Sequence, residues 1–77
     1  MKIKIIVTLK KGVLDPQGKA IQQTLNGMNF DKVSEVRQGK FFEIEIKEND
    51  ESKAKSLVDE MCKKLLANLV IEDYKIV

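Results

Sequence analysis

Apolar and polar residues alternate along the first ten positions of the chain. A repeat of two over residues 2–10 predicts a half-buried β-strand with one face directed toward a core. The apolar positions are Ile3, Ile5, Val7 and Leu9. Ile6 interrupts the alternation, because it places an apolar side chain on the face that otherwise carries lysine and threonine.

The segment that follows, LKKGVLDPQG at residues 9–18, predicts the beginning of a helix. The Asp15 side chain can accept a hydrogen bond from a backbone N–H of the first turn. Pro16 suits the first helical position, where an N–H would be unpaired anyway. Apolar residues then recur at helical spacing, at Ile21, Leu25 and Met28. We therefore expect a helix that is closed by Asn26-Gly27 or by Asn29.

Residues 33–47 predict two further strands, joined by a turn at Gln38-Gly39. Alternate positions of the second of these strands are apolar, at Phe42, Ile44 and Ile46. Phe41 falls on the opposite face, among charged residues. It therefore stands out in this strand as the interrupting isoleucine does in the first.

A second helix is predicted to begin after Asn49 or Asp50, since either side chain can cap it. Apolar residues then follow at the spacing of an amphipathic helix. They are Ala54, Leu57, Val58, Met61, Cys62, Leu65 and Leu66. The chain ends in a predicted strand over residues 70–77.

The order strand, helix, strand, strand, helix, strand predicts an α+β fold. Right-handed crossovers over one antiparallel sheet give a single ferredoxin-like βαββαβ sandwich over residues 1–77, with both helices on one face. The other face of the sheet is then open, and Ile6 and Phe41 on it are candidates for self-association. A chain of 77 residues builds a small core, which is a further reason to expect an oligomer.

The composition excludes most catalytic chemistry. Histidine is absent, which removes the commonest general acid–base and metal ligand. Cys62 lies on the apolar stripe of the second helix, so we expect a buried, inert thiol. A single cysteine also fits a reducing cytoplasm. The net charge of +2 is interspersed along the chain, and no apolar run is long enough to span a membrane, so neither a nucleic-acid nor a membrane surface is indicated.

Two other functions remain open on the residues alone. Gly39-Lys40-Phe41-Phe42 resembles the aromatic strand of RNA-recognition modules, but the first strand offers no aromatic partner for stacking bases. A ferredoxin-like regulatory domain that binds a small molecule is the main alternative. It predicts a thermal shift on adding the ligand.

Three segments occur in the order found in a known family. They are VLDPQG at residues 13–18, VRQGK at residues 36–40 and MCKKLLANLVIEDY at residues 61–74. Together they resemble the PurS family, the small subunit of phosphoribosylformylglycinamidine synthase, over essentially the whole chain.

The resemblance implies a role in de novo purine synthesis without catalytic residues in this chain. A large subunit is expected to bind ATP and magnesium, and a separate glutaminase to release ammonia. The small subunit is expected to bridge the two, as a homodimer or a dimer of dimers, so that ammonia passes between them. No cofactor or metal is expected in this chain.

Residues that the resemblance and their positions mark as interface candidates lie in three places. They are Leu14, Asp15, Pro16, Gln17 and Gly18 in the loop before the first helix, Arg37 and Lys40 around the expected turn, and Asn68, Glu72 and Tyr74 at the beginning of the last strand.

Overall fold

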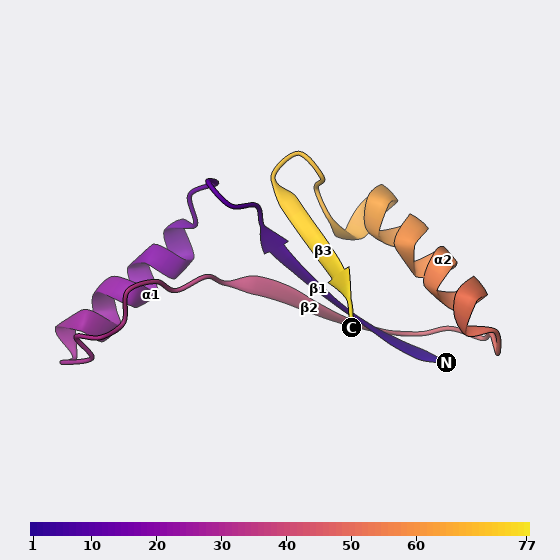
Figure 1. The fold of residues 1–77 in the computed structure, drawn as a ribbon, viewed down its shortest axis with the longest axis horizontal. Coiled ribbons are helices and arrows are strands. Elements are labelled where there is room, and N and C mark those ends of the chain that lie inside the picture. The colour runs from indigo at the N-terminus through magenta and orange to yellow at the C-terminus, as the bar shows by residue number, and fades with distance from the viewer.

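The alternating strand at the N-terminus forms the centre of the sheet. The computed structural model describes residues 1–77, and in it β1 (Lys2–Leu9) lies between β2 (Gly39–Glu45) and β3 (Glu72–Ile76). Both neighbours run antiparallel to β1. Figure 1 shows the three strands between the two helices of the chain.

The register places the two interrupting apolar residues side by side. Ile6 of β1 is paired directly with Phe41 of β2 on the open face of the sheet. Directly opposed residues on one face have neighbouring Cβ atoms, so these two side chains form one apolar contact surface. Both are exposed, Ile6 by 39% and Phe41 by 56%.

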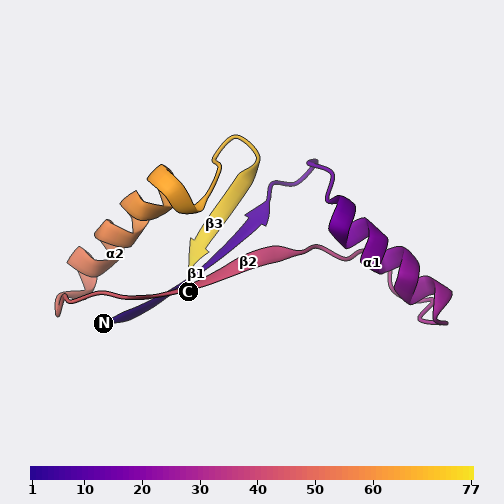
Figure 2. The same ribbon diagram turned by 180° about the vertical axis from the view of Figure 1, so that it is seen from behind.

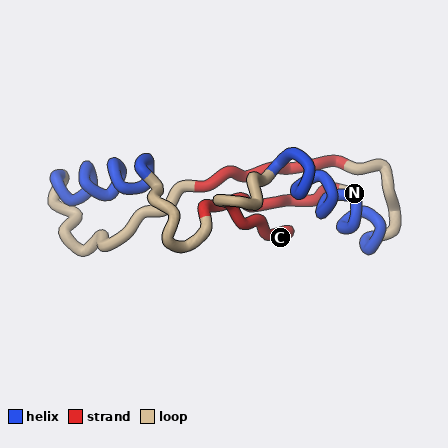
Figure 3. The backbone as a smooth tube through the Cα atoms, turned by 90° about the horizontal axis from the view of Figure 1, so that it is seen from above, coloured by secondary structure: helices blue, strands red, loops and turns tan.

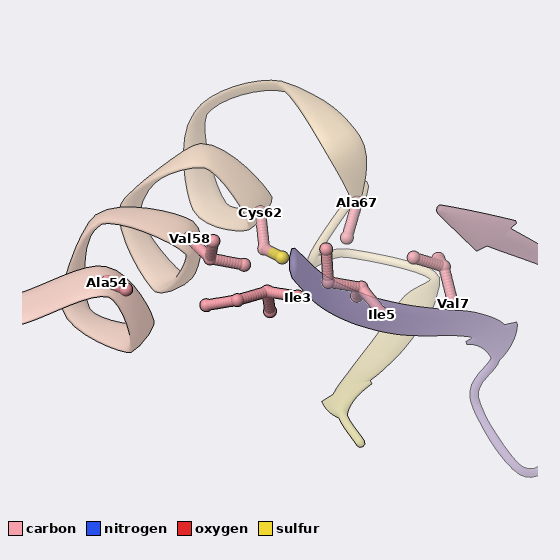
Figure 4. Packing of buried hydrophobic residues seen from close by; sticks show 7 residues of the cluster. All are labelled: Ile3, Ile5, Val7, Ala54, Val58, Cys62 and Ala67. Carbon is pink, nitrogen blue, oxygen red and sulfur yellow. The ribbon is translucent and has the colours of Figure 1, made fainter. Parts of the chain in front are cut away.

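The second helix covers the other face of the sheet. α2 (Glu51–Met61) begins at Asp50, whose carboxylate accepts hydrogen bonds from Ser52 and Lys53. It continues into a short π-helical segment, η1 (Cys62–Leu66). Figure 4 shows how this helix packs on the first strand. The buried apolar cluster consists of Ile3, Ile5, Val7, Ala54, Val58, Cys62 and Ala67.

The first helix does not pack on the sheet. α1 (Pro16–Gly27) begins at the predicted cap Asp15, and within it only Gly18 is buried. Figures 2 and 3 show α1 projecting from one end of the sheet, with the returning chain alongside it. We call residues 10–38 the arm.

The arm makes the single chain elongated. Its principal extents are 49 × 23 × 14 Å and its radius of gyration is 16.0 Å. A compact domain of this length is expected to have a radius of gyration of about 11.5 Å.

The α+β class, with an antiparallel sheet and two helices, is confirmed, but two details of the predicted sandwich are wrong. Residues 33–38 form no strand and do not turn back, so the sheet has three strands in this chain. Only α2 covers the sheet, and α1 lies beyond its end (Figure 1).

The predicted turn at Gln38-Gly39 is replaced by a continuous extended course into β2. Gly39 does not have a positive φ, which the second central residue of a type I′ hairpin turn would require. It is needed instead for close approach, because a Cβ on Gly39 would lie 2.6 Å from the carbonyl oxygen of Val7.

Candidate interface

Asp15 joins the two ends of the arm. One carboxylate oxygen accepts a hydrogen bond from the Gly18 N–H at 2.9 Å, as a helix cap does. The other accepts the Gln38 N–H at 2.8 Å, across 23 positions of sequence. These two backbone donors, helped by the nearby charge of Arg37, lower the pKa of Asp15. The Asp15 residue is 7% exposed, so its carboxylate is ionised in a mostly buried position.

Arg37 binds the loop that leads from β1 into α1. Its guanidinium donates to the carbonyl oxygens of Leu9 and Lys10 at 3.1 Å and of Val13 at 3.3 Å. The sequence marked Arg37 as a candidate for contact with a partner. In this chain, most of its donor capacity is used within the base of the arm.

The remaining residues of the Leu14–Gly18 loop differ in how they are used. The Gln17 side chain accepts a hydrogen bond from the Gln38 side-chain amide at 2.8 Å. Pro16 occupies the first turn of α1, as predicted. Leu14 is 74% exposed, so within this chain it has no core to fill.

Lys40, Glu72 and Asn68 come together on the face of the sheet that α2 covers only in part. The Lys40 Nζ lies 3.5 Å from a Glu72 carboxylate oxygen, and the other oxygen accepts the Asn68 N–H at 2.7 Å. The Asn68 side chain in turn accepts the Val70 N–H at 3.1 Å. These contacts shape the turn that leads into β3.

A shallow hollow connects the hydrogen-bonded residues around Asp15 with the Lys40–Glu72 ion pair. It is lined by Val7, Leu9, Asp15, Gln17, Gln38, Gly39, Lys40 and Glu72. Several of the predicted interface residues are therefore neighbours in space, although they come from distant parts of the sequence.

Tyr74 belongs to a different contact. Its hydroxyl donates a hydrogen bond to Asp59 of α2, which ties that helix to β3. The bond to the carboxylate raises the pKa of Tyr74 to about 12. The same bond, together with Lys63, lowers the pKa of Asp59. Asp59 was not singled out from the sequence, since its position on the polar flank of the helix carried no distinguishing signal.

Cys62 is buried, as predicted. Burial and the nearby Asp59 charge raise the pKa of its thiol, which disfavours the thiolate. No group of histidine, cysteine or acidic residues has the arrangement of a metal site. Every buried side-chain polar atom has a hydrogen-bond partner. The chain also contains no helix of the length and apolarity needed to cross a membrane.

Apolar side chains predicted to lie in the core are exposed in two places. On the second helix, three of the seven residues of the apolar stripe lie on the surface, Leu57 and Met61 in α2 and Leu65 in η1. On the arm, Ile21 and Met28 of α1 are exposed, as are Leu14 and Phe30 on either side of the helix. Periodicity identified most of these residues as apolar positions, but the chain does not bury them.

The chain is similar to known proteins along nearly its whole length. A family model described as PurS, phosphoribosylformylglycinamidine (FGAM) synthase, matches residues 2–77. The PurS subunit from Bacillus subtilis is 51% identical over 74 residues, which cover 96% of this chain and 87% of that protein. The crystal structure of Methanocaldococcus jannaschii PurS is 53% identical with a TM-score of 0.88, covering 99% of this chain and 92% of that one. A chain in the structure of PurLQS from Thermotoga maritima is 29% identical with a TM-score of 0.87, covering 100% of this chain and 96% of that one.

Proposed function

The chain belongs to the PurS family of phosphoribosylformylglycinamidine synthase, and we propose that it bridges the catalytic subunits of that ligase without performing chemistry itself. In this proposal a large subunit binds ATP, magnesium and the ribonucleotide substrate, and a glutaminase releases ammonia. The small subunit holds the large subunit and the glutaminase together in the cytoplasm so that ammonia passes between them. It takes part in purine biosynthesis as a structural member of the enzyme.

One observation carries this proposal. The chain matches, over its whole length, a chain in a structure whose name joins PurS to PurL and PurQ. Its own surface supports the same role, because exposed apolar side chains lie on the arm, on α2 and on the open face of the sheet. Exposed apolar surface in several separate places is typical of a protein with several contacts.

We further propose a homodimer in which two copies exchange their arms. The first support is an uncovered surface beside α2. Asp59 reaches Tyr74 of β3 from one flank of the helix, so Leu57 and Met61, on the opposite flank, face the β2 edge of the sheet. Phe42 of β2, paired with Ile5 on the covered face of the sheet, is only partly buried. This apolar surface beside α2 consists of Phe42, Ile44, Leu57 and Met61.

The arm of a second copy has the shape and chemistry to cover the apolar surface beside α2. α1 presents Ile21, Leu25 and Met28 at helical spacing, the first and last of them exposed. In a ferredoxin-like sandwich the two helices lie side by side on one face of the sheet. Helix α1 of one copy would therefore lie beside α2 on the sheet of the other copy. This is the position that the sequence predicted for α1 on the sheet of its own chain.

The same exchange supplies the missing strand. β2 is paired only with β1, so its outer edge has free backbone groups. Residues 33–38 are extended and lead directly into β2. The hairpin predicted at Gln38-Gly39 is open in this chain, so residues 33–37 of one copy can pair with β2 of the other copy. Such an exchange of an element between two copies is domain swapping. The four-stranded sandwich predicted from the sequence would then be completed twice, once around each sheet.

The bridging role is tested with the purified large subunit and glutaminase. Glutamine-dependent turnover is measured with and without this chain, and ammonia-dependent turnover by the large subunit serves as the control. We expect glutamine-driven synthesis to appear only with this chain present, while ammonia-driven synthesis barely changes. Equal glutamine-driven turnover without it would show that the bridge is not needed.

A further inference from the structure

The two sequence motifs of the arm meet at its base and bind each other there. The Asp15 carboxylate holds the backbone of Gln38, and the Arg37 guanidinium holds three carbonyl oxygens of the loop after β1. We call these two side chains and the backbone groups they bind the lock. A helix cap alone accounts for only one of these contacts, the bond from Gly18.

The backbone is tightly packed at the same place. A Cβ on Gly18 would clash with the carbonyl oxygen of Val36, so the first turn of α1 rests directly on the returning chain. Just beyond it, Gly39 approaches the carbonyl oxygen of Val7. Residues 36–39 are therefore held on both sides, by α1 and by β1.

We propose that the lock keeps the 33–45 segment open and so makes the exchange of arms between two copies the resting state of the protein. This inference rests on the homodimer proposed above and adds the residues that enforce it. It assigns a conformational role to Asp15, predicted as a helix cap, and to Arg37, which the sequence marked only as an interface candidate.

Closing the hairpin within one chain would break the Arg37 contacts of the lock. A two-residue turn at Gln38-Gly39 places Arg37 directly opposite Lys40. That position draws the guanidinium away from the carbonyl oxygens it binds and puts two positive charges side by side. In a type I′ turn Gly39 would also need a positive φ, which it does not have here.

The ionisation of Asp15 supports the same role. The backbone donors of Gln38 and Gly18 lower its pKa, so the carboxylate is charged at neutral pH and binds both donors at once. An amide at this position offers one acceptor oxygen in place of two. Asp15→Asn therefore removes one of the two contacts and leaves the size of the side chain unchanged.

The experiment compares dimer dissociation of the full chain and its variants by sedimentation equilibrium. We expect Asp15→Asn and Arg37→Gln each to raise the dissociation constant about tenfold or more. Asp31→Asn and Lys32→Gln are the matched controls, because these exposed residues of the same arm make no side-chain hydrogen bond or ion pair. The controls should dissociate as the unaltered protein does.

A second variant tests the competition between the lock and the turn. Gln38→Asn creates Asn-Gly, the strongest short hairpin sequence, while keeping the backbone N–H that Asp15 binds. With the lock intact the variant should remain a dimer. Combined with Arg37→Gln it should become a folded monomer, recognised by an unchanged far-UV circular dichroism spectrum.

The outcomes separate the lock from the dimer. If the unaltered protein is monomeric at every concentration, the homodimer and the lock both fail. If it is dimeric and the lock variants dissociate no more readily than their controls, the lock alone is overturned. If Arg37→Gln does not fold, Arg37→Lys replaces it, because lysine keeps the charge but lacks the planar fork that binds several carbonyl oxygens.

Discussion

The α2 half of the molecule and the arm have similar apolar patterns but opposite burial. In the α2 half, Val58 and Cys62 are fully buried against Ile5 of β1. In the arm, Ile21 and Met28 are exposed, although they recur at the same helical spacing. The difference shows that amphipathic periodicity identifies a face that needs cover without saying which chain covers it.

The largest effect is expected from a substitution in the α2 half, whose core is already buried within one chain. Ile5→Ala removes a fully buried side chain at the centre of the sheet and should lower the free energy of unfolding by about 2–5 kcal/mol. Chemical denaturation at a fixed protein concentration measures this change. A loss below about 1 kcal/mol would mean that the core relaxes to fill the space, and that the α2 half is less tightly packed than the structure indicates.

The second prediction addresses the arm. Ile21→Asp places a charge on its apolar face and should raise the dissociation constant of the dimer about 100-fold, equivalent to about 2.7 kcal/mol. The circular dichroism of the protein should change little, since this residue has no core to leave within its own chain. Gln23→Asp, with the same charge on the opposite side of α1, is the control. Equal dissociation of the two variants would mean that the apolar face of the arm has no partner.

A smaller effect is expected where α2 is tied to β3. The pKa of Tyr74 is raised to about 12 in the folded chain, whereas an unfolded tyrosine titrates near 10. The Asp59 bond therefore contributes its full stability between about pH 4, near which an unfolded aspartate titrates, and pH ~10, and this stability is lost as the pH rises through about 12. Tyr74→Phe should lower Tm at neutral pH by on the order of a few degrees.

The pH dependence supplies the control for that variant. The difference in Tm between the unaltered protein and Tyr74→Phe should shrink at alkaline pH, because the hydroxyl is then ionised in both folded and unfolded chains. A difference that is constant up to pH ~12 would contradict the assignment of the raised pKa to this bond.

The smallest effect on stability is expected at the open face of the sheet. Phe41→Ser alters an exposed side chain and should change the free energy of unfolding by about 0.5 kcal/mol or less. It should nevertheless weaken association beyond the dimer, if Ile6 and Phe41 serve the contact predicted from the sequence. Sedimentation equilibrium at high concentration measures this, and an unaltered tetramer fraction would remove the pair from the self-association surface.

Local features were predictable from the sequence because their causes are local. The cap at Asp15 and the proline in the first turn of α1 depend on residues within one helical turn, and both are found. The placement of Ile6 and Phe41 on the open face followed from two alternating patterns that both had an apolar residue on the polar face, whereas their direct pairing was found only in the structure. Such signals involve few positions and leave little choice of structure.

The course of residues 33–39 was not predictable in the same way. Glycine is favoured both by a tight turn and by the close approach of two backbones, and Gly39 serves the second purpose. The bond from Gln38 to Asp15 and the contacts of Arg37 span more than twenty positions each, so no short-range pattern signals them. The sequence therefore identified the individual residues of the candidate interface. The contacts between these residues could be found only in the folded structure.

The elongated shape has a practical consequence at the chromatography column. A radius of gyration of 16.0 Å is that of a compact protein of about 185 residues, more than twice the length of this chain. A single extended copy would therefore elute where a globular standard of dimer mass or larger is expected. Elution volume alone would count one molecule as two, and only a method that weighs the particle can distinguish an open monomer from an exchanged pair.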